Sequence, residues 1–600
     1  MIRQPVDLYA DEISASQTRP KKKVDAPYGN DIEAGKNTYV YDAHTYHTKV
    51  PPQGIAQLIS YYTEPGDTVV DPFCGSGMTG VAALELGRRA VLSDLSPAAV
   101  FIARNLCTPV DHNRFMAAVD ELIDRSTELS EKLYTTQCRD CGKAAAMLYT
   151  VWSYDLACNR CGGEFSLWDV ARDERTSVRE SKILSTFACP HCSETIAKRG
   201  LKKGRRHPVE IGYKCCAGGR QEQRARPEER DLELLQQIER QGVPSHLWYP
   251  TRTFPAGGVN TRQPIAAGID SVDKAYTKRA LWAMAHLWQL ASDYPDTQLG
   301  EKLKFALTSL YQRVTLFSEF RFWGGSGNTA NYNVPQIANE QNVFVAFRRK
   351  AATISWYFRE APNVKRDMYV GVHSATALSH IPDGGADYIF TDPPFGSNIN
   401  YSEMNLLWES WLGAFTDTTE EAIVSKPQGK SIEDYQLLLR RAFVEAYRIL
   451  RPDGWMTVVF HNSSEKVWQA LQKAITGAGF AVRGTQTFDK KHGTFKMHVS
   501  ENAVGYDLVL HCQKQSDATA VSTVFPSASV DACTAFIREA LQDPDRYRTR
   551  YLHVNRKDEF DYRRLYAEWL CQAVATTAIE VDFGKFRVMV DAVRTGSLDA

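Results

Sequence analysis

The stretch from Ser60 to Pro97 is the part of this sequence that most constrains the fold. It reads SYYTEPGDTVVDPFCGSGMTGVAALELGRRAVLSDLSP. A β-branched apolar run ends at Asp71, a glycine-rich loop and a helical stretch stopped by Gly87 follow, and a second apolar run ends at Asp94. This order predicts a strand, a loop, a helix and a second parallel strand. Ligands of such sheets bind beyond the carboxyl ends of the strands.

The alternation of strands and helices stops near Asn105 and resumes after Pro362. Strand-like runs then return as MYVGVHSATAL, GADYIFTDPPF, WMTVVFHN and GYDLVLHC, with helical stretches among them. We therefore predict an α/β fold in which a long insertion divides one doubly wound, Rossmann-like core. The predicted parts are core residues 1–110 and 366–515, a cysteine-rich insertion 111–240, a helical insertion 241–365, and a helical accessory region 516–600.

The loop from Asp71 to Gly77, DPFCGSG, differs from a phosphate-binding loop because it begins with a carboxylate. A carboxylate repels a phosphate but attracts an amino group. Asp94 lies where an acid at the end of the next strand commonly accepts hydrogen bonds from ribose hydroxyls. A ligand with an ammonium at one end and an adenosine ribose at the other is S-adenosylmethionine. The alternative interpretation is a plain turn between strand and helix with a solvated Asp71.

A second motif, Asp392-Pro393-Pro394-Phe395, ends the run YIFT and predicts chemistry on an aromatic amine. The lone pair of such an amine is delocalised into the ring, so the amine is a poor nucleophile. Asp392 can accept one N–H, and the Pro393 carbonyl, directed by the fixed φ of the prolines, can accept the other. The lone pair then points at a sulfonium methyl, and Phe395 offers a stacking face to a flipped base. The alternative is a strand end stiffened by Pro393 and Pro394.

Several segments together resemble the amino-group DNA methyltransferases of the adenine-N6/cytosine-N4 class. DPFCGSGMTG resembles their cofactor loop, TDPPF their catalytic motif, ILRPDGWMTVVF a later strand, and YHTKVPPQGIAQLISYY the segment that closes over the cofactor. NYSEMNLLWESWLG further resembles large bacterial methylases with zinc-containing insertions. The resemblance implies S-adenosylmethionine as cofactor, double-stranded DNA as partner, and transfer by base flipping. Asp rather than Ser before the two prolines favours N6 of adenine over N4 of cytosine.

The resemblance also implies a set of cofactor-binding residues. Val372-His373-Ser374 stands where the family often has a Gly-Asp or Gly-Ser pair against the adenine of the cofactor, and Ser374 is predicted from this position. The whole predicted set is Lys49, Pro51, Asp71, Pro72, Phe73, Cys74, Gly75, Ser76, Gly77, Thr79, Asp94 and Ser374.

Thirteen cysteines in a chain expected to be cytoplasmic indicate metal binding rather than disulfides. The CxxC pairs CRDCG and CNRCGG predict a zinc ribbon, with the ligands Cys138, Cys141, Cys158 and Cys161. A less regular second set consists of Cys189, Cys192, Cys215 and Cys216, with His207 as an alternative ligand for one of them. A degenerate second ribbon without metal is the other interpretation. Because no open coordination position is implied, the predicted Zn²⁺ is structural.

Two segments of the insertion are candidates for contact with DNA. KRGLKKGRRH (Lys198 to His207) predicts a phosphate-contacting patch, although such a charge run can also be merely solvated. FRFWGGSGNTANYNVPQ (Phe320 to Gln336) suits reading bases or opening a duplex, or equally a packed glycine-rich loop. The insertion as a whole occupies the place of the family's target-recognition domain.

Lys plus Arg and Asp plus Glu each number 71, so the net charge is zero and attraction to DNA must come from local clusters. The N-terminal segment lacks the apolar stretch of a signal peptide, and no run approaches the ~18 apolar residues of a membrane span. We therefore expect a cytoplasmic protein. The resemblance also suggests other components of a defence system as protein partners.

Three other functions stay open: cytosine-N4 methylation, methylation of an RNA base, and a zinc-ribbon DNA-binding subunit with a vestigial methylase core. Gly396 keeps the RNA alternative open, because some tRNA base methyltransferases carry a similar Asp-Pro-Pro-aromatic-Gly motif. The complete set of loop, acids and DPPF opposes the vestigial core. We further expect Trp408 and Trp411 to pack a helix, and His461 and Asn462 to face the pocket.

Overall fold

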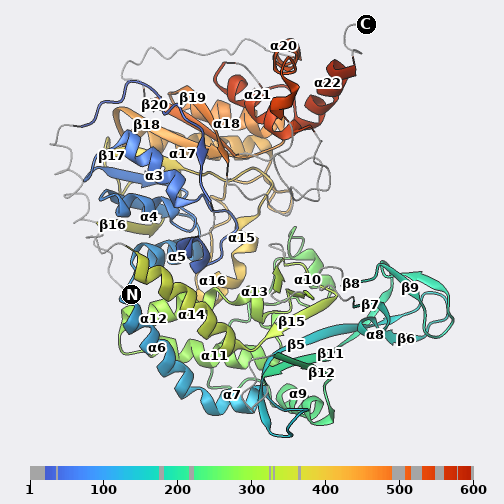
Figure 1. Cartoon of the computed structure of the whole chain (residues 1–600). Coiled ribbons are helices and arrows are strands. Elements are labelled where there is room, and N and C mark those ends of the chain that lie inside the picture. Colours follow the sequence, from blue (N-terminus) through green and yellow to red (C-terminus); the bar gives the residue numbers. More distant parts are fainter. Residues whose placement is uncertain are drawn as a thin grey trace.

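The molecule has an upper lobe, which contains the core sheet and the C-terminal helices, and a lower lobe, which contains the insertion, in the computed structural model (Figure 1). None of the described helices is long and apolar enough to cross a membrane. The structure describes residues 21–35, 38–174, 181–214, 222–322, 326–328, 332–361, 367–489, 507–514, 530–547, 560–576 and 579–595.

An eight-stranded sheet forms the core, in the order β1-β19-β20-β18-β17-β2-β3-β16. Its strands are β1 (Ile32–Glu33), β2 (Thr68–Asp71), β3 (Arg89–Asp94), β16 (Met368–Val372), β17 (Ala386–Thr391), β18 (Leu450–Phe460), β19 (Phe480–Asp489) and β20 (Asp507–Lys514). The strands from β18 to β16 are parallel, and β20 is antiparallel to both of its neighbours.

Strand β17, which precedes the DPPF motif, pairs directly with β2, which precedes the glycine-rich loop. The two chain segments that flank the insertion therefore form one sheet, and the predicted α/β fold with a Rossmann-like core is confirmed.

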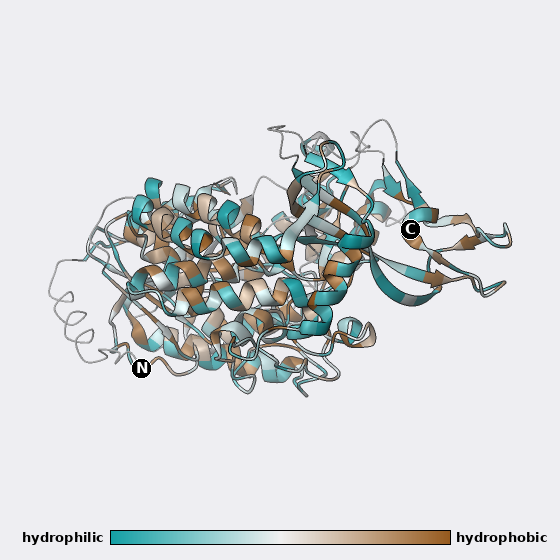
Figure 2. Ribbon diagram, turned by 90° about the horizontal axis from the view of Figure 1, so that it is seen from below, coloured by the Kyte–Doolittle hydropathy of each residue, from teal (hydrophilic) through white to brown (hydrophobic). Residues whose placement is uncertain are grey.

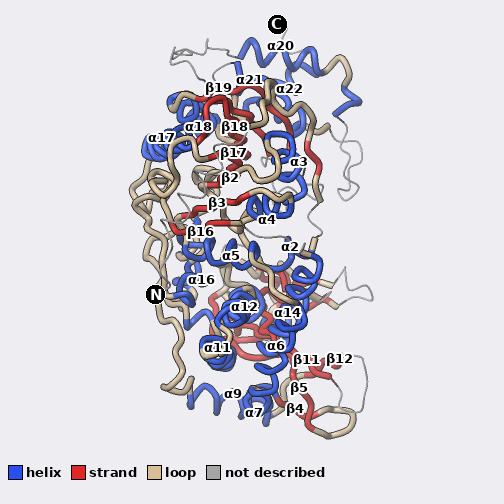
Figure 3. Tube along the Cα trace, turned by 90° about the vertical axis from the view of Figure 1, so that its left-hand side faces the viewer, coloured by secondary structure: helices blue, strands red, loops and turns tan. Residues whose placement is uncertain are grey.

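Helices cover both faces of this sheet, as in other doubly wound folds (Figure 3). On one face lie α3 (Pro52–Tyr62), α4 (Met78–Glu85) and α5 (Pro97–Cys107). On the other face lie α17 (Ile432–Ile449), α18 (Glu465–Gly477), α20 (Val530–Ala540), α21 (Tyr562–Thr576) and α22 (Phe583–Thr595). The region 516–600, predicted to be helical, contains α20, α21 and α22 among its described residues.

Helix α17 shows how local sequence fixes an element that later matters for the pocket. Its N-terminus is a capping box, in which the Ser431 hydroxyl accepts a hydrogen bond from the Asp434 backbone N–H and the Asp434 carboxylate accepts one from the Ser431 backbone N–H. Buried side chains then recur at helical spacing, beginning with Tyr435, Leu438 and Leu439. The cap and the apolar face together orient Tyr435 toward the sheet.

The insertion consists of a helical layer against the core and a second sheet beyond it. Its helices are α6 (His112–Arg125), α7 (Thr127–Tyr134), α8 (Leu167–Ala171), α9 (Glu229–Gln241), α10 (Arg262–Ala266), α11 (Lys278–Ser292), α12 (Thr297–Thr308), α13 (Tyr311–Val314) and α14 (Val343–Glu360). One apolar core runs from the core sheet into this layer, and the Tyr357 hydroxyl of α14 donates to the Leu106 carbonyl of α5 at 2.6 Å.

The second sheet has the order β12-β11-β5-β15-β13-β14, with β4 and β6 also paired to β5. Its strands are β4 (Thr135–Gln137), β5 (Ala144–Ala157), β6 (Glu164–Ser166), β11 (Lys202–Lys214), β12 (Glu222–Ala225), β13 (Ser318–Phe320), β14 (Ser326–Asn328) and β15 (Ile337–Gln341). Because β15 pairs with β5, both predicted parts of the insertion contribute to one sheet.

At its far end this sheet carries the hairpin of β9 (Thr186–Ala188) and β10 (Thr195–Ala197). Figure 1 places this tip well away from the core sheet. Viewed from below, the strands of the tip project to the right of the packed helices and alternate between hydrophilic and hydrophobic residues (Figure 2). A small core of its own supports the tip, with Trp168, Phe165 and Phe187 among its buried residues.

Candidate active site

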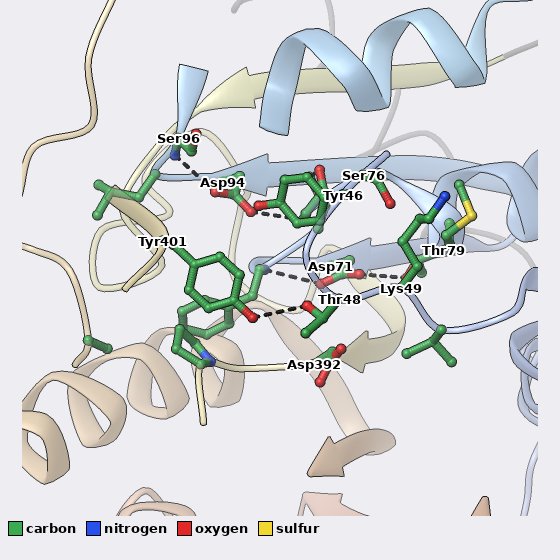
Figure 4. A pocket seen from close by; sticks show the side chains of 18 of the residues that line it. Tyr46, Thr48, Lys49, Asp71, Ser76, Thr79, Asp94, Ser96, Asp392 and Tyr401 are labelled. Carbon is green, nitrogen blue, oxygen red and sulfur yellow. Dashed lines mark hydrogen bonds between the residues drawn. The ribbon is translucent and has the colours of Figure 1, made fainter. Parts of the chain in front are cut away.

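A pocket lies at the carboxyl ends of β2, β3 and β17, where the connections of the sheet leave in opposite directions. The glycine-rich loop and the DPPF motif both contribute to it (Figure 4). Its lining consists of Tyr46, Thr48, Lys49, Val50, Ile55, Asp71, Phe73, Cys74, Gly75, Ser76, Met78, Thr79, Asp94, Leu95, Ser96, Phe390, Asp392, Pro394, Tyr401, Thr416, Glu420, Glu421 and Ala422. The structure thus brings most of the predicted cofactor-binding residues beside Asp392. Six predicted residues lie outside this lining: Pro51, Pro72, Gly77, Ser374, Pro393 and Phe395.

The backbone of the glycine-rich loop requires glycine at two positions. Gly75 and Gly77 have φ values of 49° and 79°, in the left-handed region. A Cβ on Gly77 would also lie 2.6 Å from the Cβ of Ala103 in α5. Gly77 therefore allows the loop to pack closely on α5. This packing role explains why Gly77, although predicted to bind the cofactor, does not line the pocket.

Asp71 and Asp94 are buried acids that order the loop. The Asp71 carboxylate accepts hydrogen bonds from the Thr79 hydroxyl at 2.5 Å and the Phe73 N–H at 3.1 Å. Asp94 accepts from the N–H groups of Gly75 and Ser96 at 2.8 and 2.9 Å. Burial raises the pKa of Asp71 to about 7 and that of Asp94 to about 6. A cation in the pocket would favour the ionised forms of both groups.

The catalytic motif is held through its backbone carbonyls. The Tyr435 hydroxyl of α17 donates to the Pro394 carbonyl at 2.6 Å. The Asn462 side-chain amide, at the end of β18, donates to the Phe395 carbonyl at 2.9 Å. Asn462 therefore supports the motif from behind.

Phe395 does not present its ring to the pocket in this structure. The side chain is buried and packs edge-on against Phe460, with ring centroids 5.2 Å apart. The stacking face predicted for Phe395 is therefore turned into the core. The aromatic side chains that do line the pocket include Tyr46 and Tyr401, whose rings stack at 6.4 Å.

Tyr401 begins the short helix α15 (Tyr401–Met404), and its hydroxyl lies 3.0 Å from the Thr48 hydroxyl. The site prediction did not include Tyr401, although it stands in the NYSE segment that carries part of the family resemblance. The NYSE segment is therefore the sequence signal from which Tyr401 could have been predicted.

A loop rich in acids closes another side of the pocket and was also missed. Glu420 accepts hydrogen bonds from Thr376 at 2.6 Å and from Ser374 at 3.2 Å. Glu421 accepts from the N–H and hydroxyl of Ser402 at 3.0 and 2.6 Å. The predicted residue Ser374 therefore reaches the pocket only through Glu420. No local pattern marks these acids, because their role depends on a fold-back of the chain after α16 (Leu406–Leu412).

Lys49 contributes its side chain to the lining but directs its ammonium group elsewhere. The Nζ atom donates to the carbonyls of Tyr41 and His44, in and just after α2 (Tyr39–Ala43). Figure 4 shows Lys49 at the edge of the site, away from Asp392.

Two loops of the insertion, around Val259 and around Tyr332, form hydrogen bonds to the segment that follows the catalytic motif. The buried Glu403 carboxylate accepts hydrogen bonds from the backbone N–H groups of Val259 and Asn260 at 3.1 and 2.7 Å. The Tyr332 hydroxyl donates to the Met404 carbonyl at 2.7 Å and accepts from the Leu407 N–H at 3.3 Å. We call these contacts the Glu403–Tyr332 clasp. They join the insertion to the helix that carries Tyr401.

Trp408 and Trp411 pack α16 as expected. Both are buried, and their indole N–H groups donate to the Thr308 carbonyl at 2.8 Å and the Tyr276 hydroxyl at 3.0 Å. His461 does not line the pocket and lies 3.4 Å from Asp507 instead.

The cysteines group differently from the predicted ribbons. The sulfur atoms of four cysteines lie within 4.8 Å of one another in the tip of the insertion: Cys158, Cys161, Cys189 and Cys192. Cys138 and Cys141 precede β5, whereas Cys158 and Cys161 follow it. An extended strand of 14 residues spans roughly 45 Å, so the two predicted halves of the first ribbon stand at opposite ends of β5. The predicted grouping of these four cysteines is wrong.

The β9–β10 hairpin supplies the other half of the cluster. In both pairs the first cysteine N–H donates to a carbonyl five residues on, Gly163 for Cys158 and Glu194 for Cys189, each at 2.9 Å. The Cys138 pair has the same turn, with its N–H donating to Lys143 at 2.8 Å. Cys215 and Cys216 lie outside the described residues. His207 lies 3.3 Å from Asp155 and does not belong to the cluster.

The basic stretch extends into β11. Lys203 and Arg206 lie over the ring of Tyr154, at 4.9 and 4.6 Å from its centroid, while Lys202 and Arg205 are exposed. Part of this stretch therefore packs on the sheet and part faces solvent.

The sequence of this chain was compared with known protein families. The family model described as DNA methylase, of the N6/N4 methyltransferases, matches residues 9–105 and 386–569, which are the two segments that build the pocket. These matched segments make the chain similar to this family of DNA methylases. The predicted resemblance to amino-group DNA methyltransferases is thereby confirmed.

The individual relatives match over short segments. Type II methyltransferase M.MjaII of Methanocaldococcus jannaschii is 28% identical over 101 residues, which are 17% of this chain and 19% of that protein. Putative methylase YubD of Escherichia coli is 44% identical over 52 residues, 8% of this chain and 23% of that protein. The chain thus spans about a fifth of the length of these relatives. A solved SAM-dependent methyltransferase from Methanosarcina mazei matches 28% of this chain and 79% of its own, with 10% identity and a TM-score of 0.15.

Proposed function

We propose that this methylase transfers a methyl group from S-adenosylmethionine to the exocyclic N6 amine of adenine in double-stranded DNA, with the base flipped out of the helix. One observation carries the proposal: Asp71, Asp94 and Asp392, which follow or end three separate strands, line a single pocket. The first two acids suit a cationic cofactor, and the third suits an amine that donates hydrogen bonds.

The acceptor groups of the pocket fit this cofactor. Its ammonium, sulfonium and ribose hydroxyls are cations or hydrogen-bond donors, and the buried acids of the lining are acceptors. When bound, S-adenosylmethionine supplies the activated methyl group. Tyr46 and Phe73 add apolar surface beside the acids, which suits the adenine ring.

The catalytic motif is arranged to receive an amine. Tyr435 and Asn462 bind the carbonyls of Pro394 and Phe395, and no donor among the described residues binds the Pro393 carbonyl. Asp392 would accept one amine N–H and the Pro393 carbonyl the other. These two bonds would localise the lone pair on the nitrogen, and after the methyl group has been transferred the nitrogen would release its extra proton to water.

Adenine is favoured by the residue at the start of the motif. Asp392 stands where a serine would favour cytosine in the family, and this identity is the basis for choosing N6 over N4. Tyr401, which lines the pocket beside Asp392, offers the ring face that Phe395 does not.

A direct test compares purified full-length protein with its Asp392→Ala variant on duplex DNA and on tRNA, using a labelled methyl donor and nucleoside analysis. We expect N6-methyladenine in the DNA, at least 100-fold less of it with the variant, and cofactor affinity within about twofold of wild type. Asp383→Ala, which removes an exposed acid shortly before β17, is the control and should retain full transfer. N4-methylcytosine would overturn the choice of base, label in tRNA alone would overturn DNA as substrate, and full turnover by Asp392→Ala would reject the role of this residue.

We also propose that Cys158, Cys161, Cys189 and Cys192 hold one structural Zn²⁺. Four thiol groups from two turns fit a closed tetrahedral site, which leaves no position for a substrate. Backbone N–H groups of Arg160 and His191 point at Cys158 and Cys189, each 3.4 Å from sulfur, which suits thiolates. The ion would stabilise the tip of the insertion. The exposed cations of β11 beside it support DNA as the partner of this face.

A further inference from the structure

A second cavity, of about 530 Å³, adjoins the cofactor pocket. Tyr46 and Lys49 line both cavities, so one wall is shared. The remaining lining comes from α2 and the loop after it, from α13, from β15 and from α14, and the volume is in the range of ordinary ligand sites. Neither the glycine-rich loop nor the DPPF motif contributes to it.

Cations dominate this cavity. Arg313 of α13 and Arg349 and Lys350 of α14 line it together with Lys49, and Asp42 is the one acidic residue of the lining. Among the described residues no acidic side chain forms an ion pair with Arg313 or Arg349, while Lys350 donates to the Asp42 carbonyl at 2.6 Å. Although the whole chain has no net charge, basic side chains outnumber acidic ones in the lining of this cavity.

The cations act on one another. Burial and then Arg313 lower the pKa of Lys350 to about 8, and burial and then Arg349 lower the pKa of Arg313. Arg313 and Arg349 are exposed side chains, and Lys350 is half-buried. Like charges held close together repel one another, and an anion between them would offset this repulsion.

The cavity also offers a neutral donor. The Thr45 hydroxyl is buried and has no hydrogen-bond partner in the described part of the chain, although buried hydroxyls normally have one. Gln341 and Thr353 add further polar side chains to the lining. Two guanidinium groups, an ammonium and hydroxyl donors form the set that recognises a phosphate group.

We infer that this hollow, lined by Arg313, Arg349, Lys350 and Thr45, is a phosphate-binding site. Two sources share that chemistry: a phosphodiester of the DNA substrate and a free phosphate ion. We favour the DNA phosphodiester, because the hollow adjoins the wall of the pocket in which the base would react. This choice of source rests on the proposed function, whereas the phosphate chemistry does not.

The test uses full-length Arg313→Gln and Arg349→Gln proteins, with Arg359→Gln as the matched control. Arg359 lies on the same helix as Arg349 but outside the cavity, over the ring of Trp356, and its loss removes the same charge. Calorimetry at constant ionic strength measures binding of inorganic phosphate. Fluorescence anisotropy across a salt series measures binding of a DNA duplex.

If DNA supplies the phosphate, each variant should lower the salt slope of DNA binding by about one relative to the control. If free phosphate is the ligand, each variant should weaken phosphate binding at least tenfold and leave the DNA slope unchanged. Variants equal to the control in both measurements would overturn the inference. Neither measurement requires methyl transfer, so a protein that binds phosphate but transfers no methyl group would refute only the proposed function.

Discussion

The pocket in the core and the cysteine cluster in the insertion differ in how distance along the sequence relates to distance in space. Asp71 and Asp392 are separated by the whole insertion, yet they lie at the same ends of two paired parallel strands and share a pocket. Cys141 and Cys158 are close in sequence, yet a single long strand separates them. The position of a motif relative to its strand, rather than its distance along the chain, therefore decides which residues meet.

The largest expected effect tests the new grouping of the cysteines. Cys158→Ser and Cys189→Ser should each lose the same equivalent of zinc, with its apparent binding free energy of roughly 10 kcal/mol, because one ion is shared. The double variant should lose no more zinc than either single variant. Metal analysis of the purified proteins checks this, and a doubled loss in the double variant would mean that the two pairs hold separate ions.

In the core pocket we expect a smaller but still large effect, on the affinity for the cofactor. Asp71→Ala should weaken cofactor binding about 100-fold, because it removes a pocket acid and the hydrogen bonds to Thr79 and Phe73 that order the loop. Calorimetric titration measures this. Cys158→Ser serves as the cross-control, and cofactor affinity that fell equally in both variants would show that the two sites are not independent.

The raised pKa values of the pocket acids predict a pH dependence. Asp71, with a pKa of about 7, and Asp94, with one of about 6, must be ionised to bind a cation. Affinity for the cofactor should therefore rise as the pH is raised from 5.5 to 7.5, by up to about tenfold per unit while Asp71 is still protonated. Binding at pH 6 should release protons, and Asp71→Asn should flatten the profile. A flat profile in wild type would contradict the assignment of these acids.

The smallest effect concerns the support of the catalytic motif. Asn462→Ala removes the hydrogen bond to the Phe395 carbonyl, worth about 1 kcal/mol, so the methyl-transfer rate should fall about fivefold. Cofactor affinity should not change, because Asn462 does not line the pocket. Single-turnover rates measure the first and calorimetry the second. Equal losses in rate and in cofactor affinity would indicate a general loosening of the core.

Much of the core could be predicted because its signals are local. A strand ending in Asp71, the glycine-rich loop and the DPPF motif each follow from neighbouring residues, and parallel strands bring their carboxyl ends together. Non-local contacts could not be predicted in this way. Whether the ring of Phe395 turns toward the pocket or toward Phe460 depends on packing between β17 and β18. Glu420 and Glu421 reach the pocket because the chain turns back toward it after α16. No repeat or residue spacing in the sequence predicts this turn.

The cysteine grouping failed for a related reason. CxxC turns are local and all three were recognised, but their pairing depends on the length of β5 and on the β9–β10 hairpin. A long strand with mixed burial on both faces has no strict alternation to reveal its length. The prediction paired the two CxxC turns that are nearest in sequence, and β5 holds these two turns apart.

The Glu403–Tyr332 clasp limits how this protein could be re-engineered. Exchanging its insertion for that of a known DNA methylase, in order to graft a new sequence preference, would remove the donors at Val259 and Asn260 and leave the Glu403 carboxylate buried without them. A buried acid deprived of its partners costs several kcal/mol, and that cost would fall on the helix that carries Tyr401. A working chimera must therefore carry residues 255–261 and 332–334 together with 400–407, as one transplanted unit.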